Sequence, residues 1–139
     1  MVYTDPNGSI VLPADFKELK PSYINVVKSI QALFEADLHL VYVNTPSHFR
    51  NERDIIEKLN NFAKENTIDN HNIHVYSHEH EEEGIVWFTE DFKMDMVMMA
   101  TYGRSGFSRL FEHSIAEDVV NFSKKPVVTF NLNQINKES

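Results

Sequence analysis

The stretch "MDMVMMATYGRSGFSRLFEHS", residues 94–114, decides the fold, because it leads from an apolar run through a glycine-containing turn into a helix. Met94–Ala100 is apolar except for one aspartate, and this predicts a strand covered on both faces in the interior of a parallel sheet. The next helix is expected to begin near Ser114. A strand, a turn and a helix in this order are one step of an alternating α/β fold.

The rest of the chain repeats this alternation in both directions. Short apolar runs with β-rich composition alternate with stretches in which apolar residues recur every three or four positions. The expected strands are Ser9–Pro13, Asp37–Asn44, Asn72–His78, Met94–Ala100 and Pro126–Leu132. The expected helix stripes are Tyr23, Val27, Ile30 and Phe34; Ile55, Leu59, Phe62 and Ala63; Ile85, Phe88 and Phe92; and Phe111, Ile115, Val119 and Phe122. The third strand is partly polar and is expected at a sheet edge.

This pattern predicts an α/β chain, a single doubly wound domain with a five-stranded parallel sheet, Rossmann-like in architecture. The 139 residues suit one domain, 1–139, with its core at about 9–132 and exposed ends at 1–8 and 133–139.

Composition excludes several classes of function. The net charge is −8 and the basic residues are scattered, which argues against nucleic-acid binding. No apolar run reaches the length of a membrane span, so we expect no membrane association. The chain has no cysteine, which rules out disulfides, thiolate catalysis and cysteine-based zinc sites. A cytoplasmic location is the expectation that follows.

In a parallel sheet of this kind, ligands bind beyond the carboxyl ends of the strands, where the winding reverses. The segments expected there are Pro13–Asp15, Val43–Thr45, His78–Glu82 and residues 98–114. Gly103 and Gly106 allow a ligand to approach the backbone, and Arg104 and Ser105 lie between them. Ser114 opens a helix whose N–H groups suit an anion. The alternatives are a phosphate-binding loop and an ordinary strand-to-helix turn.

Three stretches are similar to the universal stress protein family. They are "VLPADF" (11–16), "DLHLVYVN" (37–44) and "MVMMATYGRSGFSRLFEHSIAEDVVNFSKKPVVTF" (96–130), and the resemblance extends over about 9–132. It is greatest to the second domain of tandem bacterial members. The resemblance implies an adenine nucleotide, ATP or AMP, with no metal beyond nucleotide-associated Mg. It implies ribose beside Pro13 and Ala100, adenine near Asp15 and the backbone of Val43, and phosphates at the backbone of Gly103, His113, Ser114 and Ile115.

The chain departs from the family pattern at two of its three glycines. Ala100 adds one methyl group at a strand end, which we expect to be a mild change. His113 is the more serious change, because its ring takes up space that a γ-phosphate would need, although imidazole can also donate to a phosphate. Glu112 and the acidic segment "EHEEE" (79–83) add repulsion. These changes predict a weakened site that tolerates AMP better than ATP. Arg104 either contacts phosphates or forms an exposed salt bridge.

Two further hypotheses compete with nucleotide binding. His74, His78 and His80 share a strand parity, so they form either a metal site or an exposed edge strand. Family members pair through the fifth strand, here Val127–Phe130, so the chain is expected to form a homodimer or to pair with a sister domain in a tandem protein. The alternative function is therefore an interaction scaffold with a vestigial pocket. The sequence offers no catalytic constellation, and we expect at most slow, incidental ATP hydrolysis.

Overall fold

The computed structural model describes residues 8–14, 21–101 and 113–131, and these form an alternating series of strands and helices. In chain order they are β1 (Gly8–Pro13), α1 (Pro21–Leu33), β2 (Ala36–Asn44), the short 3-10 helix η1 (Pro46–His48), α2 (Glu52–Glu65), β3 (His71–Ser77), α3 (Glu81–Asp91), β4 (Met96–Thr101), α4 (His113–Phe122) and β5 (Val127–Asn131). The five expected strands are confirmed, and η1 is an element that the sequence pattern did not indicate.

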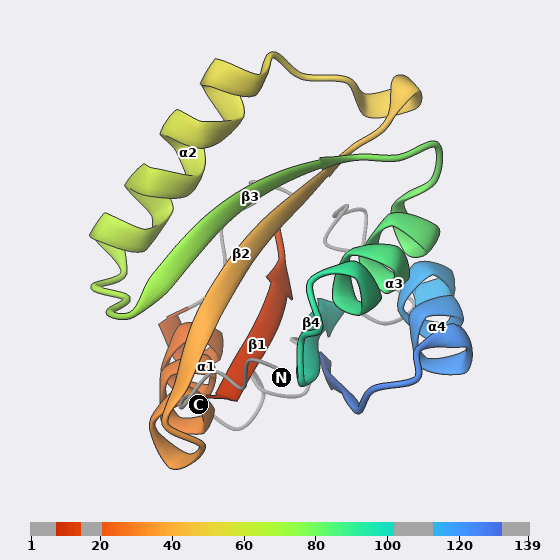
Figure 1. Ribbon diagram of the computed structural model, residues 1–139. Coiled ribbons are helices and arrows are strands. Elements are labelled where there is room, and N and C mark those ends of the chain that lie inside the picture. Colours follow the sequence, from red (N-terminus) through yellow and green to blue (C-terminus); the bar gives the residue numbers. More distant parts are fainter. Residues whose placement is uncertain (1–7, 15–20, 102–112, 132–139) are drawn as a thin grey trace, which may run out of the picture.

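The strands form one parallel sheet in the order β3-β2-β1-β4-β5. The expected edge position of β3 is confirmed, as is the interior position of β4 between β1 and β5. The chain winds from β1 outward to β3, then returns across the sheet to β4 on the other side of β1 (Figure 1). The winding direction therefore reverses between β1 and β4, which is the switch point of a doubly wound fold.

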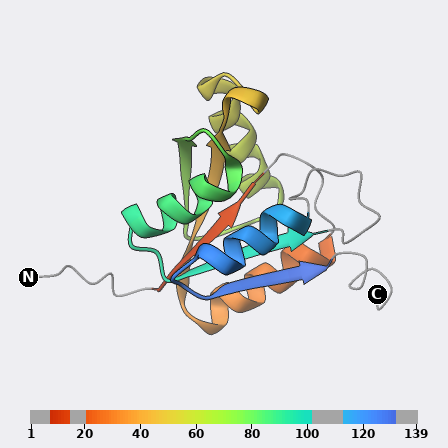
Figure 2. The same ribbon diagram turned by 90° about the vertical axis from the view of Figure 1, so that its right-hand side faces the viewer.

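Helices cover both faces of the sheet and divide the core into two layers. Figures 1 and 2 show α1 and α2 on one face and α3 and α4 on the other. The first layer packs Tyr23 and Val27 of α1 and Leu59 of α2 against even-numbered residues of β2. The second packs Phe88 of α3 and Val119 of α4 against the odd-numbered residues. This division follows from the strand period of two.

The helix stripes are confirmed at most of the described positions and wrong at three, while Phe111 lies outside the described residues. Tyr23, Val27, Ile55 and Leu59 are buried as expected. Phe34 lies beyond the end of α1 and is 54% exposed, and Phe92 lies beyond the end of α3 and is 48% exposed. Phe122, the last residue of α4, is 68% exposed. All three continue the helical period to the end of the helix or past it.

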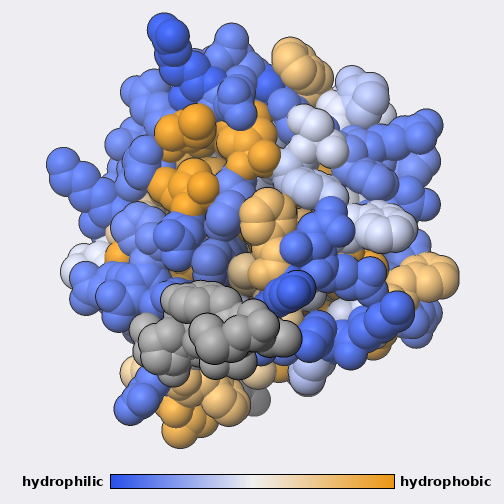
Figure 3. Space-filling view, viewed as in Figure 1, coloured by the Kyte–Doolittle hydropathy of each residue, from blue (hydrophilic) through white to orange (hydrophobic). Residues whose placement is uncertain are grey.

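Hydrophilic side chains cover most of the face that carries β3, with a hydrophobic cluster over α2 and the neighbouring part of β3 (Figure 3). Ile56 of α2 is 40% exposed, and Ile73 and Val75 of β3 are partly buried. None of the described helices is long and apolar enough to cross a membrane.

Candidate functional site

The switch point brings together the carboxyl ends of β1 and β4 and the beginning of α4. Pro13 ends β1, and β1 pairs with β4 through Val11 and Val97. Ala100 lies one residue before the end of β4 and is buried. The helix α4 begins at His113 and packs its Ala116 and Val119 into the layer that also contains Val97. α4 is the helix that follows β4 in the chain, and its first N–H groups have no partner within the helix, so they suit an anion.

β2 supplies the neighbouring wall of this end of the sheet. Pro13 pairs with Val41, and the backbone N–H of Ala14 donates to the carbonyl of Val41 at 2.8 Å. Val43 therefore lies two residues beyond the end of the β1–β2 pairing, and it is 8% exposed. The position of Val43 is fixed from behind by α3. A Cβ on Gly84 would lie 2.4 Å from Val43 Cγ1, so only glycine lets α3 approach this closely.

The connection from β2 to α2 is held by side chains at the end of the strand. The Asn44 side-chain amide donates to the carbonyl of Arg50 at 3.0 Å, and its oxygen accepts from the N–H of Arg50 at 3.0 Å. The hydroxyl of Tyr42 donates to the carbonyl of His48 at 2.9 Å. Thr45 caps η1 through a bond from the N–H of His48. Sequence reasoning placed Asn44 and Thr45 at this rim but missed their role in ordering the loop.

The rim next to β2 and β3 is acidic. Glu81, Glu82 and Glu83 form the first turn of α3, where the helix dipole favours negative charge. Glu81 Oε1 lies 3.8 Å from Nδ1 of His48, and Glu83 Oε2 lies 3.0 Å from Nε2 of His78. The main-chain N–H of His78 donates to the carbonyl of Asn44. Glu81 thus faces the β2–α2 connection, while the expected repulsion of a ligand by the segment "EHEEE" stays a prediction.

The structure places six of the ten expected site residues within its described ranges. Four elements supply these residues at the carboxyl end of the sheet, where the winding reverses. They are β1 with Pro13, β2 with Val43, β4 with Ala100, and α4 with His113, Ser114 and Ile115. His113 is part of the helix, and a helical backbone does not require glycine. Asp15, Gly103, Arg104 and Gly106 lie outside the described residues, as does Glu112.

The three histidines of the possible metal site, His74 in β3 and His78 and His80 after it, do not share one centre. Nε2 of His74 lies 2.9 Å from Nδ1 of His39 on β2, whereas His78 pairs with Glu83. Burial, and then positive charge on His39, lowers the pKa of His74. His80 is at the N-cap position of α3. Within the described ranges, no three histidine, aspartate or glutamate side chains are grouped so that they could hold a metal ion.

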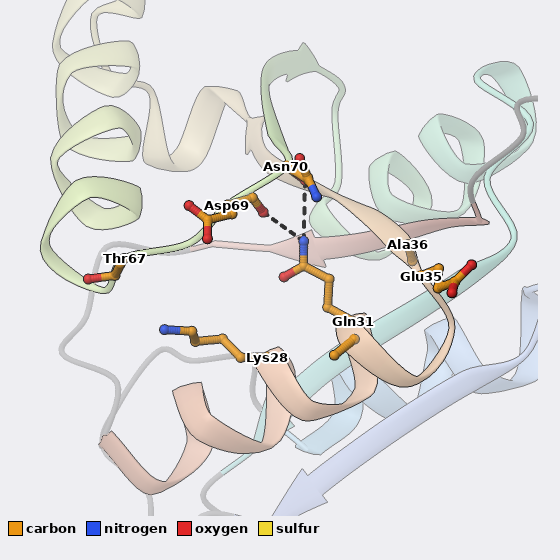
Figure 4. Close-up of a pocket in the computed structure, with 8 residues that line it drawn as sticks. Lys28, Gln31, Glu35, Ala36, Thr67, Asp69 and Asn70 are labelled. Carbon is orange, nitrogen blue, oxygen red and sulfur yellow. Dashed lines mark hydrogen bonds between the residues drawn. The ribbon is translucent and has the colours of Figure 1, made fainter.

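A hollow of about 440 Å³ lies at the end of the sheet opposite the switch point, where β2 and β3 begin (Figure 4). Its polar groups connect α1 to the α2–β3 turn. The Gln31 amide donates to the carbonyls of Asp69 and Asn70 at 2.7 and 3.3 Å, and Lys28 Nζ donates to the carbonyl of Asn66 at 3.2 Å. These bonds give the hollow a structural role, and it lies away from the strand ends at which parallel sheets bind ligands.

Comparison with known proteins agrees with this fold. The model of the universal stress protein family matches residues 7–131. A universal stress protein solved in complex with cAMP is 17% identical, with a TM-score of 0.67 and coverage of 90% of this chain and 97% of that one. One from Archaeoglobus fulgidus in complex with dAMP is 20% identical, with a TM-score of 0.64 and coverage of 93% and 98%. Universal stress protein UspA from Lactobacillus plantarum is 15% identical, with a TM-score of 0.63 and coverage of 92% and 100%. No curated protein sequence matches the chain.

Proposed function

The chain belongs to the universal stress protein family, and on this premise we propose that it is a stress-response binding domain that takes up an adenine nucleotide at the switch point of its sheet. The nucleotide, ATP or AMP, would place its ribose beside Pro13 and Ala100 and its adenine against Val43. Its phosphates would bind at the beginning of α4, at His113, Ser114 and Ile115. Gly103, Arg104, Gly106 and Asp15 belong to the same proposed site by their position in the sequence.

The proposal rests on one observation: β1, β4 and the beginning of α4 meet at the carboxyl end of the parallel strands. A parallel sheet binds ligands at such a reversal, and the N–H groups of a helix that begins there favour an anion. Two structural neighbours support an adenine ligand, since they were solved with cAMP and with dAMP.

We further propose that the site is weak for triphosphates. Three glutamates in the first turn of α3 put negative charge on the rim, and the family glycines are replaced by Ala100 and His113. Each added phosphate meets this charge, so affinity should fall from AMP to ATP. Metal enters the proposal only as Mg bound to the nucleotide. The domain acts by binding, and any ATP hydrolysis is slow and incidental.

Isothermal titration of the chain with adenosine, AMP, ADP and ATP tests the proposal. We expect measurable binding, with ATP weaker than AMP. His113→Gly should increase ATP affinity while leaving adenosine affinity unchanged, because only the phosphates reach the beginning of α4 in the proposed arrangement. Adenosine thus serves as the matched control for general effects of the substitution. Absence of binding by all four compounds contradicts the proposed function, and an unchanged ATP affinity in His113→Gly contradicts the role given to the imidazole.

A second candidate function is a scaffold that pairs through β5, and the position of this strand favours it. β5 lies at the free edge of the sheet, with β4 as its neighbour. Such an edge offers backbone groups to another strand, either of a second copy or of a sister domain in a tandem protein. Phe130 is unsuitable as a probe because its ring packs edge-on against Tyr23 at 5.6 Å. Thr129 is exposed, and Thr129→Arg tests the edge with less damage to the core.

The molar mass in solution, measured by light scattering, separates the outcomes. A dimer that becomes a monomer in Thr129→Arg supports pairing through β5. A monomeric wild-type chain contradicts a homodimer, and a dimer that survives the substitution contradicts the assignment to this strand.

A further inference from the structure

A pair of histidines, one buried and one half-buried, lies beneath α3, away from the proposed nucleotide site. His39 lies in the middle of β2 and is 9% exposed, and His74 lies on the edge strand β3. In the parallel register, His39 is opposite Asn72, and His74 is opposite Val41. The two imidazoles therefore meet diagonally across the strands, with Nδ1 of His39 and Nε2 of His74 at 2.9 Å.

The helix α3 covers this pair with aromatic rings. The ring of His74 lies 4.9 Å from that of Phe88 and 5.5 Å from that of Phe92, and these two phenylalanines stack on each other at 4.5 Å. Phe88 is fully buried. The His74 ring thus lies between His39 of β2 and the aromatic rings of Phe88 and Phe92.

The bond between the imidazoles limits the number of protons that the pair can hold. One of the two facing nitrogens must donate and the other must accept. A neutral pair and a pair with a single added proton both satisfy this condition. Protonation of both rings turns both facing nitrogens into donors, which removes the bond and leaves two positive charges in contact. His39 is buried, so a positive charge on its ring is poorly solvated.

The charged groups around the pair come from β2, α3 and the turn that follows α3. Asp37 shares the face of His39 at the partly exposed beginning of β2. Asp91 of α3 accepts from the hydroxyl of Tyr76 at 2.8 Å, and Asp95 accepts from the N–H and hydroxyl of Ser9. Across the sheet, β1 presents the apolar Val11 opposite His39. The pKa of His74 is lowered by its burial first and by charge on His39 second.

We propose that the His39–His74 pair is a pH-sensitive latch, which holds β3 and α3 on the sheet at neutral pH and releases them when both imidazoles are protonated. In the unfolded chain a histidine takes up its proton at about pH 6.5. The folded pair accepts its second proton only at lower pH. Between that pH and about pH 6.5, the unlatched state therefore binds more protons than the latched state. The latch is therefore intact above about pH 6.5 and weakens as the pH falls below that value. The inference does not depend on nucleotide binding.

Hydrogen–deuterium exchange of the whole chain between about pH 7.5 and about pH 5 tests this latch, with rates corrected for the pH dependence of chemical exchange. We expect amides of β3 and α3 to lose at least about ten-fold in protection while those of β1 and β4 keep theirs. Trp87, the one tryptophan of the chain, lies on α3, and its fluorescence should change over the same pH range.

His74→Phe keeps an aromatic ring beneath α3 but cannot take up a proton, so β3 and α3 should stay protected at about pH 5. His78→Gln is the matched control, since His78 pairs with Glu83 on the surface of the same region, and it should behave as the wild type. NMR titration of the wild-type imidazoles provides a readout if His74→Phe fails to fold. One of the pair should titrate well below pH 6.5.

Several results would overturn the proposal. One is a uniform loss of protection over all strands in the wild type, or no loss at all. Another is an equal loss in His74→Phe and in the wild type. A third is titration of both imidazoles at or above the ordinary histidine value.

Discussion

Gly84 sets the distance between α3 and the end of β2. A Cβ at this position would lie 2.4 Å from Val43 Cγ1 and 3.1 Å from the Cβ of His78. Val43 is β-branched and buried, so its side chain cannot easily turn away. The glycine therefore fixes the position of a residue that we assign to the adenine site.

We predict that Gly84→Ala destabilises the chain although alanine is the better helix former. Overpacking of a filled core costs about 1–3 kcal/mol, while the gain in helix propensity is about 1 kcal/mol. The free energy of unfolding in urea should fall by about 1 kcal/mol. Gly8→Ala is the control, because its Cβ would meet neighbours only at 3.7 Å and beyond. Equal stability of Gly84→Ala and the wild type would show that Val43 yields, and would remove the role given to the glycine.

Tyr23 illustrates the opposite case, a buried polar group that the core does not use. It is 1% exposed, and its hydroxyl has no hydrogen-bond partner in the described part of the chain. Burial raises the pKa of Tyr23. We predict that Tyr23→Phe raises the free energy of unfolding by about 1 kcal/mol, since an unpartnered buried hydroxyl costs about that much. Its edge-on contact with Phe130 is retained.

The pH dependence of Tyr23→Phe supplies a second measurement. Because the unfolded tyrosine ionises near pH 10 and the folded one does not, the wild type should lose stability as the pH rises above about 10. Tyr23→Phe should lose less. If the variant is less stable than the wild type at neutral pH, the hydroxyl has a partner that stabilises the fold.

The sequence predicted that some of these residues are buried, but it predicted none of their contacts. Burial of Val43 and Tyr23 follows from the periods of a strand and a helix. The clash at Gly84 depends on which helix face lies over which strand residue, and the pairing of His39 with His74 depends on the β2–β3 register. Those are tertiary facts. A shared parity correctly put His74 and His78 on one face, but it could not show that they have different partners.

At the scale of elements, α2 has a beginning that a side chain defines, whereas α3, the other α-helix whose N-cap the structure describes, has no side-chain cap bond. Asn51 occupies the N-cap, and its side-chain oxygen accepts from the N–H of Arg53 at 2.9 Å. Because the residue is exposed, its contribution is that of the cap alone. The cap fixes where the ordered β2–α2 connection passes into the helix.

We predict that Asn51→Ala lowers the free energy of unfolding by about 1 kcal/mol through loss of the cap. Asn60→Ala is a matched control, because the same substitution in the exposed middle of α2 should raise stability by up to about 0.7 kcal/mol. Thermal or urea unfolding measures both. If the two variants shift stability in the same direction, the cap does not explain the effect at Asn51.

The helices and strands were predictable because most show a clear period of apolar residues, which face the core. Every expected strand is present, and the boundaries differ by at most a few residues, as at Met94, which lies in the turn before β4. η1 was missed because polar bonds hold it, not an apolar pattern: Tyr42 donates to the carbonyl of His48, and Thr45 accepts from the N–H of His48. The errors at Phe34, Phe92 and Phe122 occur where a helical period continues to the end of a helix or past it.

At the scale of the whole molecule, topology and charge both affect the carboxyl end of the sheet, where we propose the site. The order β3-β2-β1-β4-β5 places the proposed site at the reversal between β1 and β4. The chain carries a net charge of −8, and part of the negative charge lies in the first turn of α3, next to the end of β2. Topology followed from the order of motifs in the sequence. The electrostatic balance of the site depends also on residues 102–112, which are outside the described ranges.

Salt should therefore change the preference among adenine ligands. Raising NaCl from about 0.05 M to about 0.3 M shortens the screening length to well below 10 Å, so repulsion between the acidic surface and the phosphates weakens. We predict that ATP affinity relative to adenosine rises by about two- to five-fold, measured by isothermal titration. Glu82→Gln should produce part of this gain at low salt, whereas Glu57→Gln, on the exposed side of α2, should not. A ratio that falls with salt would contradict this view, because it would show that cations such as Arg104 hold the phosphates more strongly than the rim repels them.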